Sequence, residues 1–115
     1  MNSLSLKLLI VRAVHSLVWL FFVVCIAAIP IAAWHGRFGT AALFAGVVAL
    51  EVAVLALNHM RCPLTTIAAR YTQNRRANFD IWLPEWLARN NQRIFGTLYV
   101  AGVAFAVVRW RSAAP

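Results

Sequence analysis

Acidic side chains are scarce in this chain. Its 115 residues include three Asp and Glu against 11 Lys and Arg, which gives a formal net charge of +8. A soluble domain has roughly 45–50% apolar residues and about a quarter charged ones. Here 63% of the residues are hydrophobic, 12% are charged, and the mean hydropathy is +0.73. The composition excludes an ordinary soluble domain and predicts an integral membrane protein.

Cysteines and catalytic signatures are also few. Cys25 and Cys62 are separated by most of a membrane span, so we expect free thiols rather than a disulfide. The sequence contains no phosphate-binding loop, nucleophile elbow, zinc-ligand spacing or carboxylate pair. We therefore expect no metal site and no active site of the kind found in soluble enzymes.

Three apolar segments predict an all-α membrane protein with a single domain over 1–115. Segment 13–34 has no acidic or basic residue apart from one histidine, and its length matches the ~30 Å hydrocarbon core at about 1.5 Å per residue. A signal-peptide core has only about 7–15 apolar residues. Segment 38–57 is interrupted by Glu51 alone, and segment 94–108 gives a shorter third span of about 22 Å.

Between the second and third spans, segment 61–93 predicts an interfacial helical region. Pro63 and Pro84 suit the first turns of two short helices. Aromatic and basic side chains alternate there, which is typical of a segment lying among lipid headgroups, with anionic lipids as partners. The residues expected at this interface are Trp82, Trp86, Arg75, Arg76 and Arg89.

The distribution of cations predicts the topology. Basic residues gather at the N-terminus and in 61–93, whereas few lie on the other side, so the N-terminus and the long loop should face the cytoplasm. This placement accounts for the net charge without a nucleic-acid partner. It also brings a polar cluster to the cytoplasmic membrane face, and its members are Asn58, His59, Arg61, Cys62, Arg93 and Tyr99.

Small residues in the second span predict helix packing. Ala45, Ala49 and Ala53 recur at every fourth position, which lets another helix approach closely in lipid. Gly102 and Ala106 in the third span form a second small pair that could receive this ridge.

Polar residues within or beside the spans are the candidate functional groups. Glu51, His15 and Arg12 lie at membrane depth or at its edge, where a bare charge is costly. Glu51 could be functional or a hydrogen-bonded structural carboxyl. His15 and His59 could ligate haem b, although histidines that are hydrogen-bonded within the protein or lie at the interface are commoner. Cys62, which precedes a proline, could be a reactive thiol, a helix cap or a lipidation site.

The chain resembles a bacterial family of small three-helix membrane proteins. The resemblance rests on His15, Trp34-His35 and Cys62-Pro-Leu-Thr65, and it is supported by segments 69–72 and 78–84. An acidic residue that often follows the Cys-Pro-Leu-Thr motif in that family is missing at 66–68. The resemblance implies a multi-pass protein of the bacterial inner membrane, and it carries no activity with it.

Three functions are compatible with these features. The leading one is an accessory or structural subunit that packs into a homo-oligomer or a larger membrane complex, with no cofactor, because three helices enclose little volume. The alternative is a redox subunit that binds haem b or quinone at the cytoplasmic face through His15 and His59. A weaker alternative is the handling of lipid or a small solute by an oligomer that uses Glu51.

Overall fold

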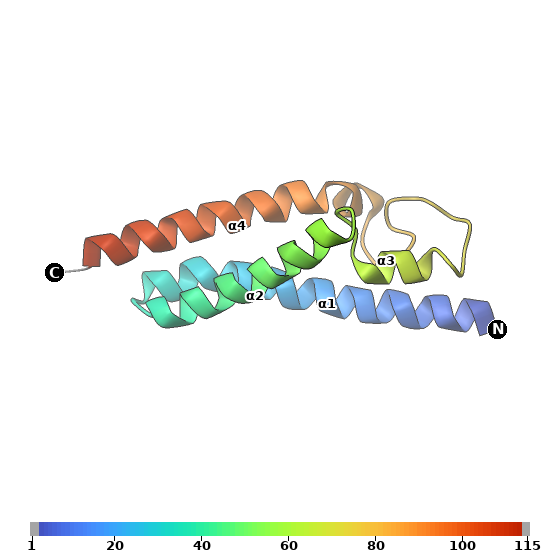
Figure 1. The fold of residues 1–115 in the computed structure, drawn as a ribbon, viewed down its shortest axis with the longest axis horizontal. Coiled ribbons are helices and arrows are strands. Elements are labelled where there is room, and N and C mark those ends of the chain that lie inside the picture. Colours follow the sequence, from blue (N-terminus) through green and yellow to red (C-terminus); the bar gives the residue numbers. More distant parts are fainter. Residues whose placement is uncertain (1–2, 114–115) are drawn as a thin grey trace. The chain divides into compact units, whose positions relative to one another are not determined.

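A computed structural model describes residues 3–113, which form helices and turns without any strand. The elements follow one another as α1 (Ser3–Trp34), α2 (Phe38–Leu57), α3 (Pro63–Ala68) and α4 (Glu85–Ala113) (Figure 1). Three of them, α1, α2 and α4, are long and apolar enough to cross a membrane, with mean hydropathies of 2.5, 2.3 and 1.3 over their most apolar windows. The expectation of an all-α chain with three candidate spans is confirmed.

Helix α2 has the bounds that its apolar run predicts, and its C-terminal end has a clear cause. His59 and Met60 adopt the left-handed conformation, with φ of 56° and 62°. The Met60 amide donates to the Leu55 carbonyl at 2.6 Å, which is the closing bond of a Schellman motif. The helix therefore ends here without the glycine that usually occupies such a position.

Helices α1 and α4 are longer than the apolar segments inside them. Helix α1 begins at Ser3 rather than near residue 13, because Lys7 and Arg12 are good helix formers and do not interrupt it. Helix α4 joins the short helix expected at Pro84 to the third span in one element of 29 residues. Segment 85–93 is thus the first part of α4 and not a separate interfacial helix.

The chain divides into two compact units. The loop unit consists of Met1–Leu20 and Ala53–Asn91, and the helical unit consists of Phe21–Val52 and Gln92–Pro115. In the loop unit, α3 lies against the N-terminal half of α1, and Val11, Ala68 and Phe79 form the buried core. The first turns of α1 are therefore part of a folded core.

In the helical unit, buried small residues hold the helices together. Ala32, Ala33 and Ala41 form a core against which Phe105 and Ala106 pack. The buried residues of α2 are Ala41 and Val48, whereas Ala49 and Ala53 are exposed. The predicted alanine ridge is thus not the face that α2 buries. Its proposed partner, Gly102, faces Pro30 instead, since a Cβ built at Gly102 would lie 3.3 Å from Pro30 Cδ.

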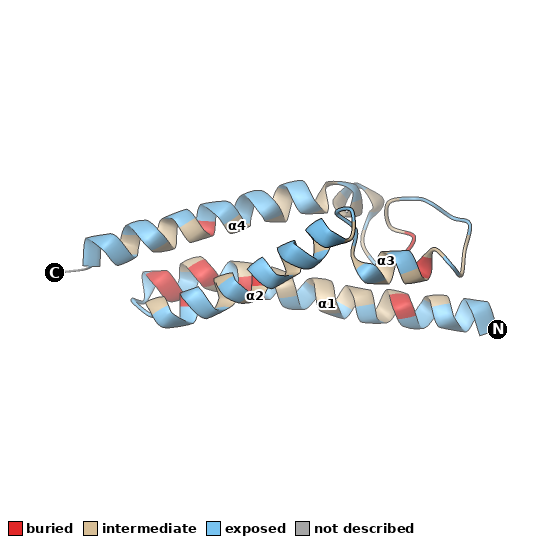
Figure 2. Cartoon of the chain, in the orientation of Figure 1, coloured by how far each residue is buried: buried red, intermediate tan, exposed pale blue. Residues whose placement is uncertain are grey.

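Large apolar side chains are exposed along all three long helices. Figure 2 colours much of each of these helices pale blue, as exposed. Leu57 at the end of α2 is 88% exposed and Leu50 is 70% exposed. Such contiguous apolar surface is unfavourable in water. It needs lipid or another protein around it.

Candidate functional site

The site is built on a polar stripe of α1, whose members recur at the three- and four-residue spacing of one helix face. They are Arg12, His15, Ser16 and Trp19. Arg12 Nε donates to the Phe79 carbonyl at 2.8 Å. The Trp82 amide donates to Ser16 Oγ at 2.9 Å, while the hydroxyl donates to the Arg12 carbonyl at 2.8 Å. The stripe thereby fixes the backbone of turn 79–82 on α1.

Asp80 is the centre of this arrangement. It is 4% exposed, and it is the one buried charged residue in the part of the chain that the structure describes. His15 Nδ1 lies 3.3 Å from Asp80 Oδ2 and 3.1 Å from the Asp80 carbonyl oxygen. Thr65 Oγ1 donates to the same carboxylate oxygen. The carboxylate thus links α1, α3 and the turn that carries it.

Cys62 also lies close to His15. The residue precedes α3, and its carbonyl accepts the Thr65 amide at 2.9 Å, so thiol and Thr65 hydroxyl belong to one turn. We call Cys62, His15, Asp80 and Thr65 the junction cluster.

The charge of Asp80 is stabilised by its partners. Burial raises the pKa of Asp80, whereas the hydrogen bonds from His15 and Thr65 lower it. The lowering is the larger effect, so the pKa lies below its ordinary value. A carboxylate held in this way binds its neighbours more strongly than a protonated acid would. The cluster is therefore built around an ionised Asp80.

Acidification should loosen the loop unit. A carboxyl whose pKa is depressed on folding stabilises the fold above its unfolded pKa, about 3.9 for Asp. That contribution is lost as the pH falls through the folded-state value. We expect the hydrogen-exchange protection of the amides in turn 79–82 to fall as the pH is lowered below about 4. In the Asp80→Asn variant this protection should depend much less on pH. Equal profiles for both proteins would contradict this assignment.

The two histidines considered as haem ligands have different environments. The His15 ring is held by Asp80, whereas His59 is exposed in the left-handed turn after α2. Two axial ligands must face one ring from opposite sides. This geometry gives no support to haem ligation. Among the described residues there is also no group of three or more His, Cys, Asp or Glu able to hold a metal ion.

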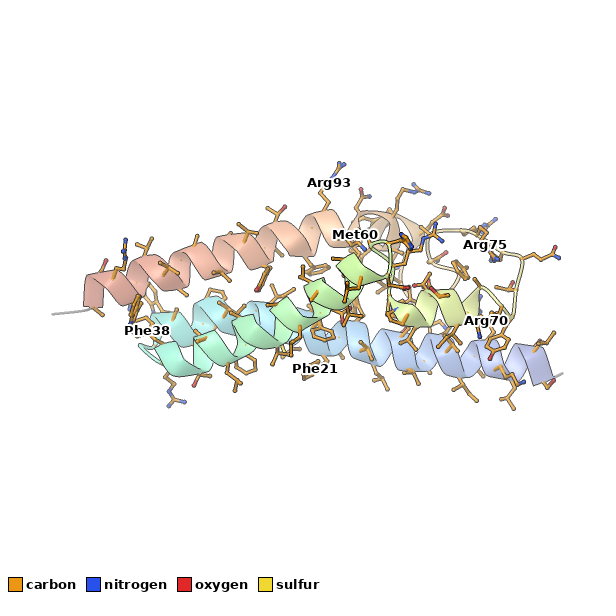
Figure 3. The ribbon with its side chains drawn as sticks, in the orientation of Figure 1. Phe21, Phe38, Met60, Arg70, Arg75 and Arg93 are labelled. Carbon is orange, nitrogen blue, oxygen red and sulfur yellow. The ribbon has the colours of Figure 1, made fainter. Side chains whose placement is uncertain are left out.

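Part of the predicted cytoplasmic cluster lies in the loop unit. Asn58 Nδ2 donates to the Arg61 carbonyl at 2.7 Å and contacts Thr66 Oγ1 at 3.3 Å, which ties the end of α2 to α3. Arg93 points away from α4 in Figure 3 and belongs to the helical unit.

Tyr99 belongs to the helical unit. Its hydroxyl donates to the Ala45 carbonyl at 2.9 Å, which is a contact near the middle of α2. Glu51 is half-buried on the side of α2 that carries Val48.

The expected interfacial residues divide into two groups. Trp82 and Trp86 are exposed, and Arg89 pairs with Glu85 at 2.6 Å on the first turns of α4. Arg75, by contrast, organises its own loop by donating to the carbonyls of Thr72, Asn74 and Ala69 and by stacking over Phe79.

The remaining candidates of the same segment also differ. Arg76 is exposed and its side chain is accessible to a headgroup. Phe79 and Ile81, read from the sequence as part of the apolar surface, are buried. These two side chains therefore belong to the core of the loop unit or its edge and not to an exposed surface.

Asp80 is the residue that the sequence interpretation missed. It lies in an apolar run, Asn78-Phe-Asp-Ile-Trp-Leu-Pro84, and is one of three acids in the chain. A buried acid within such a run must be paired. The rarity of acidic residues in this chain therefore marked Asp80 as a candidate. Its partner could not be identified, since 65 residues separate it from His15.

Comparison with known proteins adds no relative. Neither a scan of protein-family models nor searches of curated proteins and of solved structures found a match to this chain.

Proposed function

We propose that this chain is a small integral membrane protein that acts as an accessory subunit and assembles with copies of itself. The observation that carries the proposal is the open face of α2. Of its most apolar window only 11% is buried, and a Cβ at Gly46 would meet nothing within 4 Å. Ala42, Ala49 and Ala53 are exposed beside it. Small residues of this kind let helix backbones approach closely in lipid.

The remaining features agree with a structural role. The junction cluster, Arg12 and Ser16 fix turn 79–82 on α1, which gives the loop unit a defined form. The cation distribution favours an N-terminus and a 61–84 region on the cytoplasmic side of a bacterial inner membrane, near anionic headgroups. The exposed Trp82 and Trp86 suit such an interface.

Disulfide cross-linking in native membranes tests the assembly. In a chain with Cys25→Ser and Cys62→Ser, Ala49→Cys should form homodimers on mild oxidation because its side chain lies on the open face. Val48→Cys, one position along but 4% exposed, is the matched control and should remain monomeric. Equal cross-linking of the two, or none at position 49, would refute this face as the interface. Cross-links from position 49 to a different protein would favour a larger complex.

A further inference from the structure

A groove runs along the helical unit between the C-terminal half of α1 and the first turns of α2. Its volume is about 680 Å³, which is within the range of small-molecule sites. The polar residues that line it all come from the α1–α2 turn and the start of α2, and they are His35, Arg37 and Thr40. The rest of the lining is apolar. We propose that this groove binds one anionic phospholipid, with the phosphate at Arg37 and an acyl chain along α1.

The length of the groove matches one leaflet of a bilayer. Its apolar lining on α1 begins at Val24, and α1 ends at Trp34, which is about 15 Å further along at 1.5 Å per residue. Half of a ~30 Å hydrocarbon core has the same length. The polar end therefore lies at the level of the headgroups, and the acyl chain lies against Val24, Ile31 and Phe44.

The polar end suits a phosphate with no cation attached to it. Segment 24–44 contains one arginine, one histidine and no acidic residue. Arg37 is exposed, so its guanidinium can donate two parallel hydrogen bonds to a phosphate, and the Thr40 hydroxyl adds a donor. Helix α2 begins at Phe38, so the positive end of its dipole lies at the same end of the groove. A zwitterionic headgroup would bring an ammonium group for which the segment has no acidic partner.

A second groove in the helical unit provides the comparison. It lies between α1 and α4 and has a volume of about 440 Å³. Its lining is apolar throughout and includes Ile26, Phe95 and Leu98. Because no polar side chain lines it, it offers nothing to a phosphate, and charge complementarity distinguishes the α1–α2 groove from it.

The α1–α2 groove does not use the proposed assembly face of α2. Phe44 lines the groove, whereas Gly46, Ala49 and Ala53 lie about 140–180° around the helix from it at about 100° per residue. Lipid binding and assembly can therefore be tested separately. The lipid site rests on the proposed membrane insertion and is independent of the homo-oligomer.

Native mass spectrometry of the full chain in detergent tests the headgroup, with phosphatidylglycerol as the probe and phosphatidylethanolamine as its zwitterionic counterpart. We expect one phosphatidylglycerol per chain and weaker binding of phosphatidylethanolamine. Arg37→Gln should raise the Kd for phosphatidylglycerol by about tenfold, because a charge-assisted hydrogen-bonded pair is lost. Arg111→Gln removes the same charge from the exposed end of α4, outside the groove, and should bind with the parent Kd. Equal losses in the two variants, or equal affinity for the two lipids, would overturn the proposal.

Filling each groove in turn locates the acyl chain. Ala28→Phe fills the α1–α2 groove and should lose phosphatidylglycerol, whereas Ala101→Phe fills the second groove and should retain it. In the parent chain, phosphatidylglycerol with a photoreactive diazirine on its acyl chain should label segment 24–44 and leave α4 unlabelled, a result that does not depend on how the variants fold. Equal effects of the two variants, or labelling spread over all three long helices, would overturn the site. Loss of a dimer in Ala28→Phe with lipid binding unchanged would assign the groove to a second copy.

Extraction with alkaline carbonate separates this proposal from the proposed function. A chain that carbonate releases from membranes would refute the membrane insertion on which both rest. A chain that resists carbonate and still binds no phosphatidylglycerol would overturn the lipid site alone.

Discussion

Replacing Asp80 with alanine should loosen the attachment of turn 79–82 to α1 by about 3–5 kcal/mol, the cost of removing one partner of a buried ion pair. The side chains of His15 and Asp80 are 13% and 5% exposed, so water cannot replace the lost carboxylate. Thr65 loses its acceptor as well. The free energy of local opening, obtained from hydrogen exchange of the turn amides, measures the effect.

The exposed pair on α4 supplies the control for this prediction. Arg89 and Glu85 form an ion pair four residues apart, with side chains 63% and 42% exposed. Glu85→Ala should change stability by no more than about 0.3–0.5 kcal/mol, because water and salt screen such a pair. A similar effect of Asp80→Ala and Glu85→Ala would mean that the buried pair does not hold the turn.

Helix α2 shows what composition and length could predict. Its apolar run is bounded by a short polar turn on one side and by Asn58 on the other, and the helix has the bounds of that run. Helices α1 and α4 extend beyond their apolar runs because lysine, arginine and glutamine continue a helix as well as leucine does. Apolar length therefore predicts how much of a helix can lie in lipid, and it does not predict where the helix ends.

The candidate site shows the limit of the same reasoning. Arg12, His15 and Cys62 could be recognised as candidates from the sequence because they occur where candidate spans begin and end. Asp80 was missed because its role depends on a turn that reaches back over 65 residues to His15. The direction of α2 was also misjudged. Regularly spaced alanines mark a face that another helix can approach closely. Which face of α2 is buried within the chain also depends on the bulky side chains of the other helices.

The two sides of α2 can therefore serve different purposes. One side buries Ala41 and Val48, and it receives the Tyr99 hydroxyl at the Ala45 carbonyl. The other presents Gly46, Ala49 and Ala53. Because the first side makes contacts within the helical unit, the second is the side on which we propose that copies of the chain meet. This division is why a stripe that fails as an internal contact still supports the proposed assembly.

Enlarging Gly102 should destabilise the helical unit. The neighbouring side chains leave no room, since a Cβ there would lie 3.3 Å from Pro30 Cδ and 3.8 Å from Ile29 Cγ2. Gly102→Leu should lower the free energy of unfolding by about 1–3 kcal/mol through overpacking. We expect this loss although replacing a helical glycine would otherwise gain about 0.5–1 kcal/mol. Unfolding in detergent, followed by helical circular dichroism, gives the value.

Gly96 is the matched control for Gly102, because it lies on the same helix and a Cβ there meets nothing within 4 Å. Gly96→Leu should leave the stability unchanged or raise it by up to about 1 kcal/mol, since the helix gains propensity without a clash. A loss of stability in both variants would indicate that α4 tolerates no bulk on any face. A loss confined to Gly102→Leu would establish the close approach of α4 to Pro30 as the contact that holds α1 and α4 together within the helical unit.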